Sequence, residues 1–181
     1  AETFPLDRPN YCGLAYEPTR DVLVLVNSGS DTISIHERKT FKKLEEVYYS
    51  NKHLDGDEGV HHLNDVCVSG DYIYVSYFSH AGTFKKGIYD GGVSEIHIDR
   101  LDAPPVPTYS GLWMPHSPEL IEDNICVLDS MRGRFHTDNQ TIAGQFPGWI
   151  RGLAYDGRYY YIGQSENMYL SRLLGTNATV M

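Results

Sequence analysis

The sequence predicts an all-β protein, a β-propeller of about four blades that forms either a minimal ring or part of a larger one. Three observations predict it. A pattern of two short strands joined by a polar turn occurs four times in 181 residues. Segments that follow two of the copies alternate apolar and polar residues, as half-buried outer strands do. Fourteen tyrosines and few helix-favouring runs agree with β-structure.

Each copy consists of an inner segment, a tight turn and an apolar strand. The inner segments are residues 12–16, 64–68, 116–120 and 151–155. The turns are residues 18–21, 69–71, 122–124 and 156–158. The apolar strands are residues 22–26, 72–75, 125–128 and 159–162. Because the turns contain Gly, Asp and Asn, which tolerate the positive φ of tight hairpins, each copy predicts the two inner strands of one blade.

The remaining segments complete the blades. Residues 32–36 and 93–98 alternate as outer strands, and residues 39–48 fit either a short helix or an outer strand. A glycine-rich insertion at residues 78–92 separates the second and third strands of the second blade, and such loops are usually functional or mobile. We expect one domain over residues 1–181, in which residues 3–6 add an outer strand to the last blade and close the ring. The alternative is a β-sandwich.

Composition narrows the function classes. The net charge of −9, from 15 basic and 24 acidic residues, disfavours nucleic acid as a partner. No apolar run is long enough for a membrane span, so we expect a soluble protein. The sequence lacks the nucleophile-elbow, P-loop, dinucleotide-binding, zincin and C-x-x-C motifs. Cys67 and Cys126 lie within apolar strands and should be reduced and buried, which favours the cytoplasm over the alternative of secretion.

Alignment of the four copies predicts a polar ring at one mouth of the propeller channel. The start of each inner strand and the end of the next strand lie at the same end of a blade, because the two strands are antiparallel neighbours. The aligned starts are Cys12, Asn64, His116 and Arg151, and the aligned ends are Asn27, Tyr77, Asp129 and Gln164. Next to them in the sequence are Asp65, Ser117, Ser130 and Arg132. A concave mouth with such groups is a candidate ligand site.

These residue types suggest three sets of roles. The candidate catalytic set is His116 as general base or metal ligand, Arg151 for an anionic group, and Asp129 within reach of one of them. A divalent cation, either Ca²⁺ or a transition metal, would use Asn64, Asp65 and His62. The candidate ligand-binding residues are Asn27, Tyr77, Ser117, Arg132 and Gln164. The alternative is that these polar groups only cap strand ends or hold internal water.

The second half of the chain contains several distinctive motifs. They are S-G-L-W-M-P-H-S-P at residues 110–118, V-L-D-S-M-R-G at 127–133, P-G-W-I-R-G-L-A at 147–154 and G-Q-S at 163–165. They resemble the motifs of a family of bacterial β-propellers of unknown function, with Met131 where glycine is usual. H-L-N-D at residues 62–65 is similar to an earlier element of that family. This resemblance implies a propeller fold. It implies no particular activity, because the family has no established one.

A more distant similarity is to gluconolactonase-like propellers, which hold a divalent cation with Glu, Asn and Asp. Asn64 and Asp65 resemble one such element. The sequence therefore predicts two alternative functions. The sequence does not decide whether the protein is an enzyme. The first is a propeller that binds a small polar or saccharide-type molecule, with a metal-dependent hydrolase or lactonase as its enzymatic form. The alternative is a non-catalytic scaffold that binds a protein partner or joins an oligomer or larger assembly.

Overall fold

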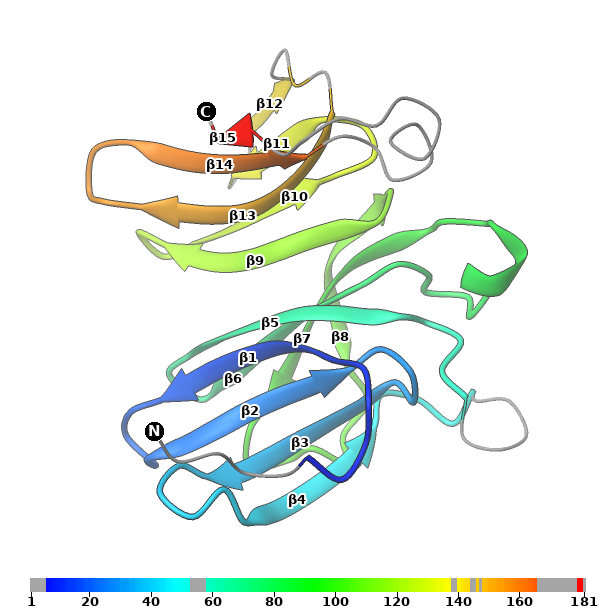
Figure 1. Ribbon diagram of the computed structural model, residues 1–181, viewed down its shortest axis with the longest axis vertical. Coiled ribbons are helices and arrows are strands. Elements are labelled where there is room, and N and C mark those ends of the chain that lie inside the picture. The colour runs from blue at the N-terminus through cyan, green and yellow to red at the C-terminus, as the bar shows by residue number, and fades with distance from the viewer. Residues whose placement is uncertain are drawn as a thin grey trace.

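The computed structural model describes residues 6–52, 58–137, 140–143, 146, 148–165 and 179–180. Within these ranges the protein is almost entirely β-structure, arranged in four antiparallel sheets (Figure 1). The helical element in this part of the chain is a single 3-10 turn, η1, at Phe84–Lys86. The sheets are here called blades 1 to 4 in chain order.

Each blade is a meander in which neighbouring strands in the sequence pair in space. Blade 1 consists of β1 (Tyr11–Glu17), β2 (Val22–Asn27), β3 (Thr32–Glu37) and β4 (Lys43–Tyr48). Blade 2 consists of β5 (Leu63–Ser69), β6 (Tyr72–Tyr77), β7 (Gly91–His97) and β8 (Val106–Leu112). Blade 3 consists of β9 (Pro115–Ile121), β10 (Asn124–Asp129), β11 (Arg134–Thr137) and β12 (Gln140–Ala143). Blade 4 consists of β13 (Trp149–Tyr155), β14 (Tyr160–Ser165) and β15 (Thr179–Val180).

The first strands of the blades lie side by side. β1 contacts β5, β5 contacts β9, and β9 contacts β13. Blade 1 and blade 4 stand at opposite ends of this row, so the four blades form an open arc (Figure 1). The predicted propeller is therefore confirmed as an arc of four blades, with the predicted inner strands lining its concave side.

The hairpin turns have the chemistry that the sequence predicts. Asp21, Glu122 and Asp123 adopt positive φ values of 53°, 50° and 65°, and Gly70 and Gly157 also adopt positive φ. Two consecutive left-handed residues, as at Glu122 and Asp123, give the turn whose twist matches that of the flanking strands. Each turn therefore fixes the register of the two inner strands of its blade.

A β-bulge interrupts every innermost strand at the same place in the repeat. The pairing shifts register at Cys12 in β1 and at Asn64 in β5. It also shifts at residues 117–118 in β9 and at residues 151–152 in β13. A bulge redirects side chains and increases the local twist, and bulges are common next to functional sites. The bulges lie at or beside the polar positions that the repeat alignment identified.

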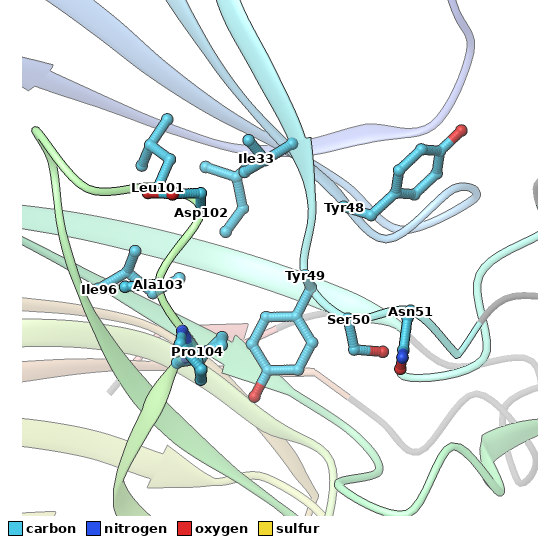
Figure 2. A pocket seen from close by; sticks show the side chains of 12 residues that line it. Ile33, Tyr48, Tyr49, Ser50, Asn51, Ile96, Leu101, Asp102, Ala103 and Pro104 are labelled. Carbon is cyan, nitrogen blue, oxygen red and sulfur yellow. The ribbon is translucent and has the colours of Figure 1, made fainter.

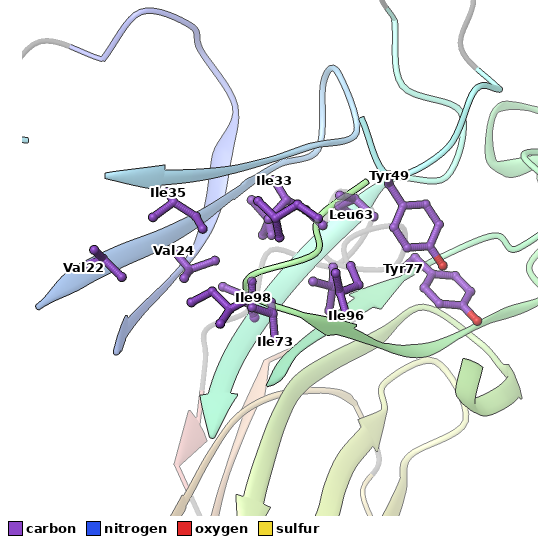
Figure 3. Packing of buried hydrophobic residues seen from close by; sticks show 14 residues of the cluster. Val22, Val24, Ile33, Ile35, Tyr49, Leu63, Ile73, Tyr77, Ile96 and Ile98 are labelled. Atoms are coloured by element: carbon purple, nitrogen blue, oxygen red, sulfur yellow. The ribbon is translucent and has the colours of Figure 1, made fainter. Parts of the chain in front are cut away.

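Apolar side chains fill the spaces between successive blades. The largest cluster joins blades 1 and 2 and includes Val24, Ile33, Leu63, Ile73 and Tyr77 (Figure 3). A second cluster lies between blades 2 and 3, and a third between blades 3 and 4. A fourth cluster contains Phe78 after β6, Met114 before β9 and Trp149 in β13. Most of the core is thus divided into layers that two neighbouring sheets share.

Several expectations about individual segments can be compared with the structure. The segment 39–48 contains a strand, β4, and no helix. Cys67 and Cys126 are buried and are not in a disulfide, as expected. Residues 3–5, expected to close the ring, lie outside the described residues, and Leu6 is not in a strand. No helix in the described part of the chain is long and apolar enough to cross a membrane.

Candidate functional site

The repeat alignment brings several of its predicted residues together at the concave mouth of the arc. The amide Nδ2 of Asn64, in β5, donates to the carbonyl oxygen of Pro115, the residue before His116 in β9, at 3.2 Å. Phe78, from the insertion of blade 2, and Trp149, from blade 4, pack against the imidazole of His116, with ring centroids 5.4 and 5.6 Å away. The charge of Arg151, in β13, also acts on this imidazole. We refer to the region around His62, His116 and Arg151 as the mouth.

His116 is buried and its tautomer is fixed by its surroundings. Its Nδ1 lies 3.0 Å from the carbonyl oxygen of Met114 and 2.8 Å from the hydroxyl of Ser130. Because a carbonyl can only accept, Nδ1 carries the proton. Burial lowers the pKa of His116 to about 3, and the positive charges of Arg151 and His62 act in the same direction. The imidazole is therefore neutral at physiological pH, and its Nε2 is a hydrogen-bond acceptor.

The acceptor atom of His116 is available to a ligand. Nε2 forms no hydrogen bond with the described residues, and it is not among the fully buried polar atoms that lack a partner. Some of its surface therefore reaches solvent, although His116 as a whole is only 6% exposed. Trp149 packs against the same imidazole edge-on, with ring centroids 5.6 Å apart, and supplies an apolar wall beside it.

Arg151 contributes a positive charge that no carboxylate of the described residues neutralises. Its side chain is exposed, and it forms no ion pair or hydrogen bond within the described part of the chain. Other arginines, such as Arg20 and Arg38, are paired with aspartates. In a protein with a net charge of −9, an unpaired guanidinium at a concave mouth is a candidate anion-binding group.

His62 and the insertion of blade 2 form an aromatic wall of the mouth. The imidazole of His62 packs against Phe78 and Phe84, with ring centroids 4.4 and 4.3 Å apart. Phe78 also contacts His116, at 5.4 Å between centroids. Burial lowers the pKa of His62. Phe84 belongs to η1, so the insertion brings this ring against the mouth; only blade 2 has such an insertion among the described segments.

The metal candidates Asn64 and Asp65 are engaged in joining blades. One carboxylate oxygen of Asp65 accepts from the backbone N–H of Ser117 at 3.2 Å, and the other accepts from that of Val66 at 3.0 Å. The hydroxyl of Ser117 in turn accepts from the N–H of Gly152 at 3.0 Å. These bonds, with that of Asn64 to Pro115, run from blade 2 through blade 3 to blade 4.

The same kind of bond starts in blade 1, where the Cys12 thiol donates to the carbonyl oxygen of Leu63 at 3.2 Å. The bulge residues therefore link each inner strand to the next. Among the described residues, no group of three or more His, Cys, Asp or Glu side chains is placed to hold a metal ion. His62, the third metal candidate, packs in the aromatic wall and not beside Asp65.

Asp129 does not lie where it was expected. Its buried carboxylate accepts from the backbone N–H of Trp113 at 2.8 Å and from Arg132 at 3.3 Å. Its further neighbour is His136, at 3.9 Å, and not His116 or Arg151. Arg132 also donates to the carbonyl oxygen of Gly111 and lies over the Trp113 ring. Asp129 and Arg132 thus hold the turn of blade 3 together, because a buried carboxylate needs such donors.

The other predicted ligand-binding residues have mainly structural positions. Asn27 is buried, and its side-chain oxygen accepts from the N–H groups of Gly29 and Ser30, which closes its own turn. Tyr77 is fully buried in the cluster between blades 1 and 2, because it lies on the same face of β6 as Ile73 and Val75. Gln164 lies at the end of β14, and its buried Oε1 has no hydrogen-bond partner.

Sequence reasoning did not identify a groove beside the mouth. A recess of about 410 Å³ lies next to His62 and is lined by residues of both blade 1 and blade 2, among them Asn10, Ser28, Glu58, Phe84 and Lys85. We call it the mouth groove. The only signal for it in the sequence was the glycine-rich insertion that carries Phe84 and Lys85.

A further cavity lies away from the mouth. It has a volume of about 430 Å³ and lies between the end of β4 and the segment 101–105. Figure 2 shows Tyr49 and Pro104 on its two sides, with Ile33 and Leu101 farther along. None of the mouth residues lines it, and its inner wall is formed by side chains of the cluster between blades 1 and 2.

Comparisons with solved structures support the fold. The chain is similar to a protein assigned as a gluconolactonase, with a TM-score of 0.61 and 17% identity over 86% of this chain and 57% of the other. It is similar to a chain of a nidogen–laminin complex, with a TM-score of 0.62 and 11% identity over 87% and 57%. It also resembles the PQQ-bound aldose sugar dehydrogenase of Streptomyces coelicolor, with a TM-score of 0.54 and 17% identity over 87% and 56%.

At these identities the likeness concerns the fold alone, and the chain spans a little more than half the length of these structures. A search of curated protein sequences found no match. The model of one protein family matches residues 13–177, almost the whole chain. The chain belongs to this family, DUF4915, a domain of unknown function.

Proposed function

We propose that the protein binds a small anionic sugar at the mouth, between His116 and Arg151. The observation that carries the proposal is the pair of unused groups that meet there. One is the solvent-open Nε2 of a neutral imidazole, and the other is an unpaired guanidinium. A hydroxyl donates well to such an imidazole, and a carboxylate or phosphate pairs with such a guanidinium. One ligand that carries both groups would use both residues.

The walls of the mouth fit the same class of ligand. His62 is a half-buried ring on which the apolar face of a sugar can pack, whereas the rings of Phe78 and Trp149 are buried together in one apolar cluster. Two of the similar folds have names that refer to sugar chemistry, a gluconolactonase and an aldose sugar dehydrogenase. The neutral His116 Nε2 is also the kind of atom that acts as a general base, so the same site could hydrolyse a lactone form of its ligand.

The test is calorimetric titration with D-glucuronate and, for comparison, neutral glucose. We expect wild-type protein to bind glucuronate at least about 10-fold more tightly than glucose, and Arg151→Gln to remove this preference, since the loss of one charge-assisted contact is worth about a factor of 10 or more. The matched control is Arg158→Gln. Arg158 is an exposed arginine of the same blade that packs over Tyr159 at the hairpin turn.

Arg158→Gln should bind glucuronate as the wild type does. Equal affinity of the wild type for the charged and the neutral sugar would contradict the proposal, as would an Arg151→Gln variant that keeps the preference.

A further inference from the structure

We propose that the mouth groove is a second sugar subsite, with Phe84 as its stacking platform, so that the ligand is an acidic oligosaccharide of at least two rings. This inference rests on the proposed function and extends it. It begins from the insertion of blade 2, which the anionic subsite around His116 and Arg151 does not require.

Hydrogen bonds and an ion pair hold the insertion in one conformation. The Asp90 carboxylate accepts from the Ser79 hydroxyl at 2.7 Å and from the N–H of Ala81 at 3.0 Å, which ties the two ends of the insertion together. At its tip, Lys85 forms an ion pair with Glu58, which lies just before blade 2. Phe84 is only half-buried although it packs on His62. The insertion therefore presents an aromatic ring and an ammonium group at fixed places beside the mouth.

The lining of the groove combines aromatic surface with hydrogen-bonding groups, and a sugar ring can use both. Phe84 and His62 offer ring surface. Around them stand the Asn10 amide, the Ser28 hydroxyl, the Glu58 carboxylate and the Lys85 ammonium. The amide and the hydroxyl can both donate and accept, the carboxylate accepts and the ammonium donates. Glu58 and Lys85 already pair with each other, and the hydroxyls of a sugar can add hydrogen bonds to all four groups, which an apolar compound cannot do.

The two subsites are contiguous. Phe84 packs on His62, His62 packs on Phe78, and Phe78 packs on His116. Phe78 and His116 are buried, so the part of this row that a ligand can touch is the half-buried rings of His62 and Phe84. The groove volume of about 410 Å³ lies within the range of ligand pockets and is ample for one sugar ring. The geometry therefore points to two linked rings, one with its acidic group at Arg151 and the next above Phe84.

The experiment compares D-glucuronate with a disaccharide of glucuronic acid and glucose by calorimetric titration of the full chain. The wild type should bind the disaccharide about 10-fold more tightly than the monosaccharide, because one additional ring gains a stacking surface and hydrogen bonds. Phe84→Leu keeps apolar packing against His62 and removes the flat ring. It should abolish the gain from the second ring and change the affinity for glucuronate much less.

Lys85→Ala is a second variant, at an exposed side chain whose removal should not disturb the fold. It should reduce the gain in part. If both variants keep the full preference for the disaccharide, or if the wild type shows no preference, the second subsite is refuted. The anionic subsite fails separately, when Arg151→Gln binds both sugars as the wild type does while Phe84→Leu still lowers affinity for the disaccharide.

Discussion

At the scale of single residues, the surroundings of a side chain decide its chemistry more than its type does. His116 and His62 are both imidazoles beside the mouth. His116 has a fixed tautomer and an open acceptor atom, whereas His62 is part of an aromatic wall. Asp129 resembles a catalytic carboxylate in the sequence, yet its bonds to Trp113 and Arg132 give it a structural position. The roles predicted from the sequence for His116 and Arg151 stay predictions, whereas the carboxylate expected beside them bonds to Trp113 and Arg132 instead.

The burial of His116 predicts a contribution to stability that depends on pH. The unfolded chain titrates this group near pH 6.5, whereas the folded protein keeps its pKa at about 3. Above pH 6.5 both states are neutral and the contribution to the free energy of unfolding is complete. As the pH falls toward 3, only the unfolded state takes up the proton. The free energy of unfolding should then fall by about 1.4 kcal/mol per pH unit from this group.

Urea unfolding of wild type and His116→Asn between pH 4 and pH 8 tests this. The asparagine amide can still donate to the Met114 carbonyl oxygen but does not titrate. The wild type should lose stability relative to the variant as the pH falls below 6.5. Curves that stay parallel over the whole range would show that His116 is protonated as easily in the folded protein as in the unfolded chain.

At the scale of strands and loops, close packing between strands makes certain glycines essential. A Cβ atom on Gly92 in β7 would lie 2.0 Å from the carbonyl oxygen of Tyr109 in β8 and 2.7 Å from the Tyr77 hydroxyl in β6. Gly92→Ala should therefore force the strands apart and cost about 1–3 kcal/mol or more in the free energy of unfolding. Ser110→Ala is the control, since Ser110 pairs with Gly92 in the register and is exposed.

Thermal and urea denaturation of the two variants provide the measurement. A Gly92→Ala protein as stable as Ser110→Ala would mean that β7 and β8 can separate without cost at this point. The same close approach shows why the insertion of blade 2 ends in two glycines. They let the chain return from the insertion into a pair of tightly spaced strands.

The strands could be predicted from the sequence and the side-chain directions at the mouth could not. Apolar alternation and the Asp-rich and Gly-rich turns predict the four hairpins, and the structure has them at those positions. A bulge then shifts the register in each inner strand, so period-two alternation no longer tells which way Asn64 or Arg151 points. Tyr77 is the corresponding error, because the sequence does not show that a strand-end residue packs between two blades.

The role of Phe84 could not be predicted for a related reason. It lies in an insertion without periodicity, and its contact with His62 joins residues that are 22 positions apart. Only the folded blades bring the two rings together. The glycine-rich composition indicated a functional loop, but nothing local identified the residue that faces the mouth.

At the scale of the whole molecule, the layered core makes stability local. Three of the four apolar clusters each join two neighbouring blades, and the bonds between bulges run from one blade to the next. Architectures built this way behave as a sum of repeat and neighbour-interface terms. The fold also does not determine the activity. Function depends on which residues a given chain places at the mouth.

This organisation predicts that a destabilising substitution in one apolar cluster weakens mainly the blades that share this cluster. Leu153 is a buried residue of the cluster between blades 3 and 4, and Leu153→Ala should cost about 2–5 kcal/mol locally because it leaves a cavity there. Hydrogen exchange followed by mass spectrometry should show lost amide protection in β13 and β14, with β2 and β6 protected as in the wild type. Ile73→Ala, in the cluster between blades 1 and 2, should give the reverse pattern. Equal loss of protection in all blades from either variant would show that the arc unfolds as one unit, and the layers would then not be independent.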